Sequence, residues 1–255
     1  MSIIAHASID ENKNIKGGIP GDQTGKEVCT RSWYLKNWQY VIRPKSEKIA
    51  AKAVAIATAV TLNPNVGYNQ AKRNTLYKEL KAHGYDVAAI GKCDTDCSAF
   101  MTACYIAAGV NKLEYETNAP TTSTMVKAFR NTGQFEILSG AEYLRIDARL
   151  KPGDVLVQPG HHTVMVVEVS DPYMEPSSIL VKGSKGNAVK WLQWQLVRWG
   201  YLDWDEVDGD FGKKTHRAVC SLQAAKALQI DGEVGPKTLQ LLRSEVKYGD
   251  KRDRC

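Results

Sequence analysis

An eight-residue pattern occurs twice near the C-terminal end of this 255-residue chain. The copies read DGDFGKKT at residues 208–215 and DGEVGPKT at residues 231–238, so both fit D-G-x-x-G-x-K-T and begin 23 residues apart. Glycine permits backbone angles that other residues avoid, and the threonine can cap a helix that follows it. The repeat therefore predicts two similar turns, each joining one helix to the next.

Apolar residues recur at helical spacing before, between and after the two turns. They predict helices over residues 187–199, 215–228 and 238–246, which together form a small all-α unit of three helices at residues 183–246. Four tryptophans lie in or beside it: Trp191, Trp194, Trp199 and Trp204. We expect at least two in the core, while an exposed one, Trp194 or Trp204, would offer a surface for stacking on a sugar ring.

The preceding part of the chain, residues 1–176, has a different pattern. It opens with the strand-like segment SIIAHASID, continues with helical patterns over 46–62, 69–82 and 97–109, and ends with a strand hairpin over 154–169. Helices followed by a sheet predict an α+β fold. Clustered proline, serine and glycine residues predict a linker at 177–182, and residues 247–255 form a charged tail.

Composition and charge narrow the class of protein. The chain is 43% hydrophobic and 24% charged, as in ordinary soluble proteins. Its longest apolar run, residues 50–60, is too short to cross a bilayer, and the start of the chain lacks the features of a secretory signal, so we expect synthesis in the cytoplasm. The net charge is +6, of which +4 lies in residues 177–255. That excess suits an anionic polymer or simply a solvated surface; no arginine-rich helix suggests nucleic acid.

Cysteine chemistry is the strongest catalytic signal. Cys97 stands at the start of an apolar helix between Asp96 and Ser98. The positive end of a helix favours thiolate over thiol, and a thiolate is the attacking species in cysteine hydrolases. Cys104, among alanines, suits a buried apolar thiol instead. Cys93 and Cys97 have no partner pair at zinc-ligand spacing, so we expect neither a metal nor a cofactor.

A cysteine nucleophile needs a base. His161 and His162 stand at the entry of an apolar strand, where neighbouring residues point to opposite faces, so only one can meet the cysteine. His162 shares its face with Val164 and Val166. We therefore take His162 as the base and keep His161 as the alternative.

The C-terminal unit resembles the small peptidoglycan-binding domains. The shared positions are those of G-x-x-G-x-x-V-x-x-L-Q from Gly183, of both D-G-x-x-G turns and of the threonines after them. This resemblance implies that peptidoglycan is the partner.

Three segments in order resemble the papain-like wall hydrolases of the CHAP and NlpC families. They are Asp-Cys-Ser at 96–98, Pro-Gly-Asp-Val at 152–155 and Gly-His-x-x-x-Val-Val on the strand. The resemblance implies a papain-like fold with helices packed on a small antiparallel sheet. It also implies amide hydrolysis through an acyl-enzyme, with Cys97 as nucleophile and His162 as base and later acid.

Two further roles follow from this resemblance. The segment GYNQAKRN, residues 67–74, is similar to one that precedes the cysteine helix in phage lysins, so Tyr68 or Gln70 is a candidate for the oxyanion pocket; a helix-capping turn is the alternative. The families orient the histidine from the next strand, yet here the chain leaves for the linker soon after Glu168. We therefore expect Asp22 or Gln23 of the GDQTG loop to orient it, unless that loop is simply a tight turn.

Taken together, these features predict a monomeric phage or prophage endolysin. It would be made in the host bacterium and reach the wall after holin-type release. It would cut either the amide between glycan and stem peptide or one within the peptide. The alternatives are a wall-binding protein with a decayed hydrolase domain and a glycosidase, although no supporting carboxylate pair stands out.

Overall fold

The structure is a computed structural model that describes residues 2–145, 147, 149–169, 173–203 and 206–244. The chain divides into two compact units, residues 1–170 and 171–255. Trp204 and the predicted tail at 247–255 lie outside the described residues. Within the described part of the chain, no helix is both long and apolar enough to cross a membrane.

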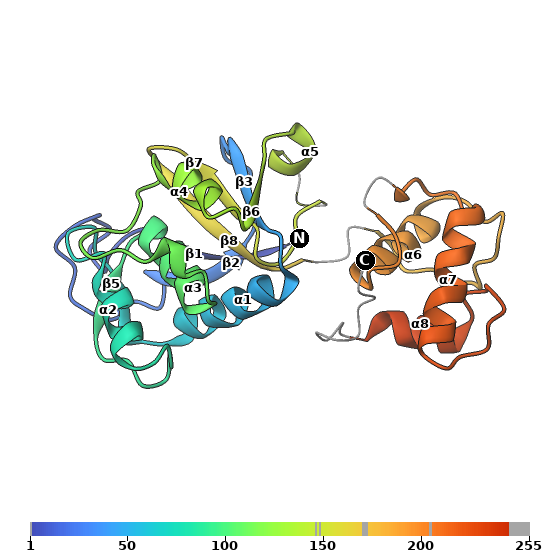
Figure 1. Ribbon diagram of the computed structural model, residues 1–255, viewed down its shortest axis with the longest axis horizontal. Helices are drawn as coiled ribbons and strands as arrows, with labels where there is room; N and C mark the ends of the chain where they lie inside the picture. Colours follow the sequence, from blue (N-terminus) through green and yellow to red (C-terminus); the bar gives the residue numbers. More distant parts are fainter. Residues whose placement is uncertain (1, 146, 148, 170–172, 204–205, 245–255) are drawn as a thin grey trace. The chain divides into compact units, whose positions relative to one another are not determined.

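A six-stranded antiparallel sheet forms the centre of the first unit (Figure 1), in the order β2-β1-β8-β7-β3-β6. Its strands are β1 (Ile3–Ala7), β2 (Val28–Ser32), β3 (Tyr40–Pro44), β6 (Phe135–Leu138), β7 (Val155–Gln158) and β8 (His162–Glu168). The N-terminal strand β1 lies between β2 and β8, with Ile3 opposite Glu168 and Ala5 opposite Met165. The strand next to β8 on the side away from β7 is thus β1, from the N-terminal part of the chain. A second, parallel pair joins β4 (Val66–Tyr68) to β5 (Cys93–Thr95).

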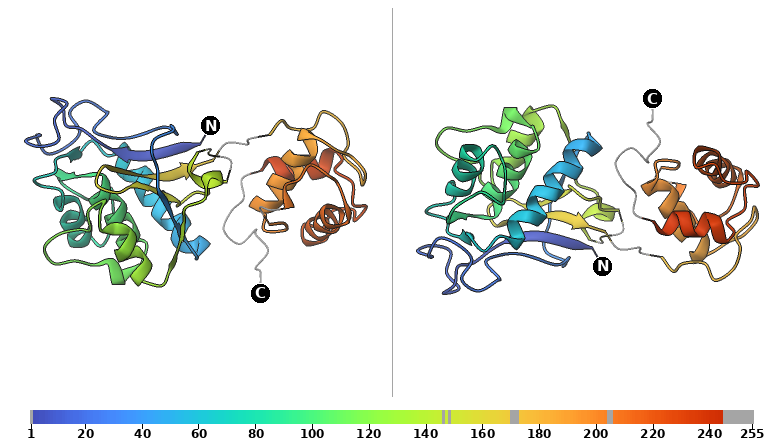
Figure 2. Two further views of the ribbon diagram at one scale, coloured as in Figure 1. Left: turned by 90° about the horizontal axis from the view of Figure 1, so that it is seen from above. Right: turned by 90° about the horizontal axis from the view of Figure 1, so that it is seen from below.

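Most helices of the first unit lie on one face of this sheet (Figure 2), whereas Tyr143 and Leu144 of the short helix α5 pack on the opposite face. The first unit contains α1 (Glu47–Leu62), α2 (Thr75–Ala82), α3 (Cys97–Ala107), the 3-10 turn η1 (Asn111–Leu113), α4 (Met125–Asn131) and α5 (Ala141–Leu144). Every residue of α3 is buried, and both α1 and α3 pack against β8. Because side chains alternate along a strand, Ala5, Val155 and Met165 face these helices and share their core. The mixture of helix and sheet is the expected α+β class, although three strands precede the first helix.

The opposite face of the sheet carries a smaller apolar cluster. Ile4, Leu156 and Val164 point into it, and Trp38 from the β2–β3 loop covers them. At the edge of this cluster the buried Asp154 carboxylate accepts two hydrogen bonds from the Arg43 guanidinium, at 2.8 and 2.6 Å. The Pro-Gly-Asp-Val segment therefore has a structural role, since its aspartate fixes the entry of β7 to β3.

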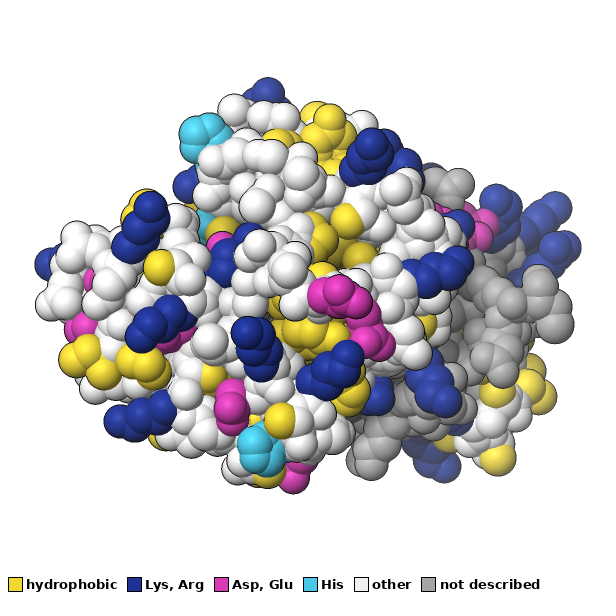
Figure 3. Space-filling model, turned by 60° about the vertical axis from the view of Figure 1, so that its left-hand side comes forward, with side chains coloured by type: hydrophobic (Ala, Val, Ile, Leu, Met, Phe, Trp, Pro, Cys, Tyr) yellow, Lys and Arg dark blue, Asp and Glu magenta, His cyan; other side chains and the backbone are white. Residues whose placement is uncertain are grey.

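The surface of the first unit mixes basic, acidic and apolar side chains (Figure 3). Large apolar side chains are exposed on the loops that follow β1 and β2. They include Ile15 and Ile19 in the first loop and Leu35 in the second. These loops thus present apolar as well as polar groups to solvent.

The second unit contains α6 (Asn187–Arg198), α7 (Lys213–Ala225) and α8 (Pro236–Arg243). A buried glutamine holds each repeated turn. Gln193 donates to Asp208 Oδ1 at 2.7 Å, to the Asp210 carbonyl and to Thr215 Oγ1, and its own oxygen accepts the Gly209 N–H at 2.8 Å. Gln223 makes the same four bonds with the second turn, accepting the Gly232 N–H at 2.9 Å. The repeated sequence therefore produces a repeated hydrogen-bond network.

Two sequence predictions about this unit need correction. The segment predicted as a linker at 177–182 belongs to the second unit, because Leu180 is buried in its core and bridges to Val234. Trp194 is only 1% exposed, so it packs in the interior and offers no surface for a sugar ring. The amphipathic pattern of α6 identified its inner face, and Trp194 lies close enough to that face to be covered.

Candidate active site

Cys97 is the first residue of α3, and its sulfur is next to the backbone N–H of Thr163 near the start of β8. Asp96 caps the helix: its Oδ1 accepts the Ala99 N–H at 2.7 Å and the Ser98 hydroxyl at 3.1 Å. The Cys97 side chain is buried, and the backbone N–H groups of Ser98 and Thr163 favour the ionised form of its sulfur. Thr163 follows His162 in β8, so the backbone beside the predicted base reaches the sulfur of the predicted nucleophile. Among the described hydrogen bonds, the one from the His162 ring goes to His6 and none goes to Cys97.

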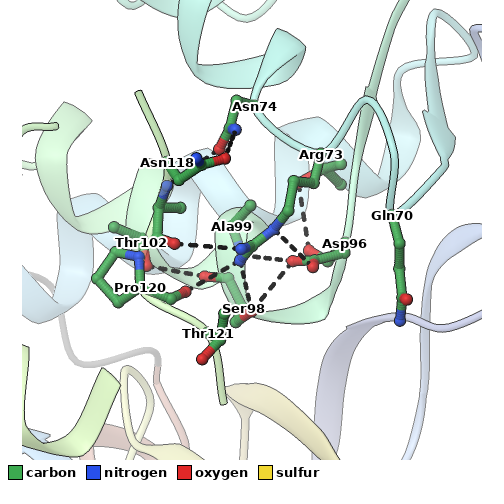
Figure 4. Close-up of polar contacts among 12 residues, drawn as sticks. Gln70, Arg73, Asn74, Asp96, Ser98, Ala99, Thr102, Asn118, Pro120 and Thr121 are labelled. Carbon is green, nitrogen blue, oxygen red and sulfur yellow. Dashed lines mark hydrogen bonds and ion pairs between the residues drawn. The ribbon is translucent and has the colours of Figure 1, made fainter. Parts of the chain in front are cut away.

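A buried arginine holds both flanks of Cys97 (Figure 4). Arg73 forms an ion pair with Asp96, Nε to Oδ2 at 2.7 Å, and donates to Ser98 Oγ at 2.8 Å. The same guanidinium donates to the carbonyls of Ala119 and Pro120 at 3.1 and 3.0 Å. Arg73 therefore ties the start of α3 to the loop before α4. Planar guanidinium geometry suits such simultaneous contacts.

His162 has a second histidine as its polar partner. Its Nε2 lies 3.1 Å from Nδ1 of His6, which comes from β1. Both residues are buried, whereas His161 is exposed in the turn before β8. His162 thus has a buried polar neighbour from the N-terminal strand, while its role as the base, with His161 as the alternative, stays a prediction.

Aromatic rings enclose this pair. Ring centroids are 6.2 Å apart for Trp38 and His162, 5.9 Å for Tyr34 and Trp38, and 6.5 Å for His6 and Tyr34. The two histidine rings are 5.2 Å apart and nearly perpendicular, which closes the set. The imidazoles are therefore held by packing as well as by hydrogen bonding.

The electrostatics of the site favour uncharged groups. Burial, followed by repulsion from Arg31 and Lys36, lowers the pKa of His6 to about 4. Burial, the neighbouring His6 and the same two cations lower the pKa of His162 to about 3. Burial and the Asp96 charge raise the pKa of Cys97 to about 12, although Arg73 and two N–H groups oppose this. The expected thiolate at the helix start is thus outweighed by desolvation, and thiol and imidazole are both neutral at pH 7.

The candidate orienting groups Asp22 and Gln23 lie elsewhere. Asp22 Oδ1 accepts the backbone N–H groups of Thr24 and Gly25, and Gln23 Nε2 donates to carbonyls of its own loop. In the described structure the polar contact of His162 is with His6 instead. The alternative considered from the sequence, a tight turn, is what the GDQTG loop forms.

Tyr68 and Gln70 lie together, and Tyr68 is close enough to Cys97 for the charge of one to affect the other. Gln70 Nε2 donates to the Tyr68 hydroxyl at 3.3 Å. Burial raises the pKa of Tyr68, and the proximity of Cys97 raises it further, so this phenol keeps its proton. Tyr68 can therefore donate a hydrogen bond close to the sulfur.

Among the other described cysteines, Cys220 also has a histidine neighbour, since its Sγ lies 3.8 Å from Nδ1 of His216 one turn earlier on α7. Cys29, Cys93, Cys104 and Cys220 are free thiols, and Cys104 is buried within α3 among apolar neighbours. Within the described residues, no three His, Cys, Asp or Glu side chains are grouped to hold a metal ion.

Sequence reasoning missed His6. Its partner is 156 residues away, and no local pattern links the two. The available signal was the alternating segment SIIAHASID, which places a histidine on the same strand face as Ile4. That pattern predicts a strand but does not predict which strand it will join.

Comparisons with known proteins identify a family for each of the two units. The endolysin-like domain family matches residues 4–173, and the chain belongs to that family. The model of a peptidoglycan binding domain matches residues 185–242. A Bacillus licheniformis protein named "Probable N-acetylmuramoyl-L-alanine amidase" is 41% identical over 86 residues, which are 32% of this chain and 24% of that protein.

Two solved structures share limited similarity. A fused Zn-dependent amidase, peptidase and peptidoglycan-binding protein from Clostridium acetobutylicum is 31% identical over 29% of this chain and 33% of its own, with a TM-score of 0.28. A peptidoglycan-binding protein from Clostridioides difficile, in complex with glutamine hydroxamate, is 24% identical over 38% of this chain and 76% of its own, with a TM-score of 0.25. This chain thus spans about a quarter of the curated relative and a third of the first structure.

Proposed function

We propose that this chain is a peptidoglycan hydrolase that cleaves an amide bond with the Cys97 thiol as nucleophile. The observation that carries the proposal is the position of Cys97, which starts α3 and meets the backbone N–H of Thr163, the residue after His162 of the His162–His6 pair. Membership of the endolysin-like family, the peptidoglycan-binding match and the amidase relative support the substrate class.

The histidine pair suggests how the proton moves. With its Nε2 facing His6 Nδ1, His162 can donate Nε2–H to that nitrogen and keep the lone pair of its own Nδ1 for Cys97. Because the thiol is neutral at rest, we propose that its proton passes to His162 Nδ1 as the sulfur attacks the carbonyl carbon. His6 then stabilises the imidazolium through the hydrogen bond that it accepts.

The later steps need no further groups. The carbonyl oxygen of the substrate gains negative charge, which the Tyr68 hydroxyl and a backbone N–H would stabilise. Collapse of this intermediate breaks the C–N bond, and the amine leaves with the proton from His162. Water then attacks the thioester, His162 takes a proton from that water, and a carboxylic acid is released as the thiol re-forms.

Lysis of purified walls tests the proposal. Wild type should reduce turbidity, while Cys97→Ala should still bind the walls but lose lysis. Cys104→Ala, on the same helix, is the matched control and should remain lytic once its folding is verified. New amino groups in the digest would support amide cleavage. New reducing ends, or full lysis by Cys97→Ala, would rule the mechanism out.

The bond and the route to it are parts of the same proposal. The scissile amide lies either between glycan and stem peptide or within the peptide, and mass spectrometry of the digest distinguishes the two. Access to the wall would follow holin-type release from a bacterial host. Lysis of cells that express the chain with and without a holin would test this route.

A further inference from the structure

Two cations stand beside the histidine pair. Arg31 on β2 and Lys36 in the β2–β3 loop are both exposed, and each lowers the pKa of His6 and of His162 by charge repulsion. The Arg31 guanidinium lies 5.0 Å above the Tyr34 ring. Among the described residues, neither cation is in an ion pair with a carboxylate. The site therefore carries positive charge that this part of the chain does not neutralise.

That charge works against the proposed reaction. His162 must hold a proton while the thiol attacks, and like charges nearby make the imidazolium harder to form. Two exposed cations at this position would slow catalysis if the substrate brought no negative charge next to them. The arrangement is consistent with efficient catalysis if an anion lies beside them when the reaction occurs.

A cavity adjoins the same group. It has a volume of about 460 Å³, and Leu35, Lys36, Trp38, Leu144 and Arg145 are among the residues that line it. Trp38 also stacks on His162, so the cavity and the catalytic pair share one wall. Lys36 and Arg145 bring positive charge to the lining, which contains no acidic residue. The lining thus combines polar and apolar groups and contains two cations.

We propose that this cavity, with Arg31 and Lys36 at its catalytic side, is a subsite for a carboxylate of the stem peptide. The inference rests on the proposed function. A carboxylate of the molecule being cut can sit next to the scissile amide, whereas the phosphates of teichoic acid belong to a separate polymer. The bound carboxylate would neutralise the two cations and thereby make His162 a stronger base.

The subsite should affect both binding and turnover. Hydrogen bonds between charged groups would favour substrates with a free carboxylate by about 10- to 100-fold in kcat/KM. Part of that preference should appear in kcat, because the anion also assists protonation of His162. A subsite that only attracted the substrate would change KM alone.

Chemically modified walls provide the test. Purified walls are stripped of teichoic acid with hydrofluoric acid, and half are then converted from carboxylate to carboxamide with a carbodiimide and ammonia. Release of amino groups is followed for the full-length wild type and for Arg31→Gln/Lys36→Gln. Lys48→Gln/Lys52→Gln is the matched control, because it removes the same charge from exposed positions of α1, on the other face of the sheet. Binding of Cys97→Ala to treated and untreated walls is measured as well, so that any effect of amidation on wall binding by the second unit can be taken into account.

The outcomes separate the two proposals. We expect wild type and the α1 variant to prefer untreated walls about 10-fold or more, and Arg31→Gln/Lys36→Gln to lose most of that preference while it still cuts amidated walls. Equal cleavage of both walls by wild type would overturn the subsite but leave the hydrolase intact. An unchanged preference in Arg31→Gln/Lys36→Gln would likewise overturn it. No cleavage of any wall would instead refute the proposed function.

Discussion

The two units hold their key structures by contacts of very different sequence separation. In the second unit, Gln193 and Gln223 lock turns that lie 15 and 8 residues away, counted to Asp208 and Asp231. In the first unit, His6 meets His162 across 156 residues. A local network can form as soon as its own helix and turn exist, whereas the pair of histidines forms only after β1 has paired with β8. Changes in the second unit should therefore stay local, and changes in the first should affect the whole site.

Replacement of His6 tests the long-range contact and should have the largest effect. His6→Phe keeps a ring on β1 but removes the acceptor for His162, so kcat should fall about 100- to 1,000-fold with little change in KM. His6→Asn restores an acceptor oxygen and should recover part of this loss. Lysis rates with unchanged wall binding provide the measurement. Full activity in His6→Phe would show that His162 is oriented by packing alone.

Arg73→Met should have the next largest effect. It leaves the Asp96 carboxylate unpaired beside Cys97, and breaking such a buried pair costs about 3 kcal/mol or more in free energy of unfolding. Loss of the cation should also raise the pKa of the Cys97 thiol, because Arg73 favours the thiolate. Urea unfolding gives the first quantity, and the pH dependence of alkylation by iodoacetamide gives the second.

Arg73→Lys is the control for that variant, since it keeps the positive charge but loses the planar guanidinium that bonds several partners at once. It should restore the alkylation profile more fully than the stability. An alkylation profile that stays unchanged in Arg73→Met would limit this residue to a structural role.

The two turns should respond alike to the loss of their glutamines. Gln193→Leu and Gln223→Leu each leave a buried glycine N–H without its acceptor, which costs about 2 kcal/mol. Hydrogen exchange of the full chain should show faster exchange at the affected turn, while activity on soluble fragments is retained. Unequal effects at the two turns would indicate that the repeat is alike in sequence but not in energy.

The last prediction concerns the pH dependence of stability, and its size depends on how far the pH is lowered. Both histidines have a lower pKa in the folded chain than the ordinary value of 6.5. Stability is therefore complete above about pH 6.5 and falls as the pH drops towards 4, because the unfolded chain binds protons that the folded chain does not. The slope should reach about 1.4 kcal/mol per pH unit for each histidine. Urea titrations at pH 7, 5.5 and 4.5 measure it, and His6→Asn should lower the slope. A flat profile would mean that the pair is not buried in the neutral form.

Much of this structure could be predicted from local patterns in the sequence. The cap at Asp96 and the apolar run after it indicated a helix over 97–109, and α3 spans Cys97–Ala107. The glycines of the repeat likewise indicated both turns. What failed depended on contacts beyond any local window: the position of β1, the burial of Trp194 and the inclusion of Leu180 in the second core.

The charge state of Cys97 failed for another reason. A helix terminus is visible in a sequence, but the extent of burial around it is not. Here the Cys97 side chain is buried, and desolvation outweighs the effect of the helix dipole. The partner of His162 was unpredictable for a similar reason. The families that this chain resembles supply it from the next strand, whereas here it comes from β1 at the other end of the unit's sequence.

The position of β1 also imposes an order on biosynthesis. As the ribosome releases the chain from its N-terminal end, residues 3–7 emerge first and residues 162–168 emerge almost at the end of the unit. Until then the edge of β1 that will receive β8 has open N–H and C=O groups, and closing so long a loop is entropically costly. The nascent enzyme should consequently stay inactive until nearly the whole first unit is outside the exit tunnel, and stalled intermediates should be prone to pair their exposed strand edges with one another.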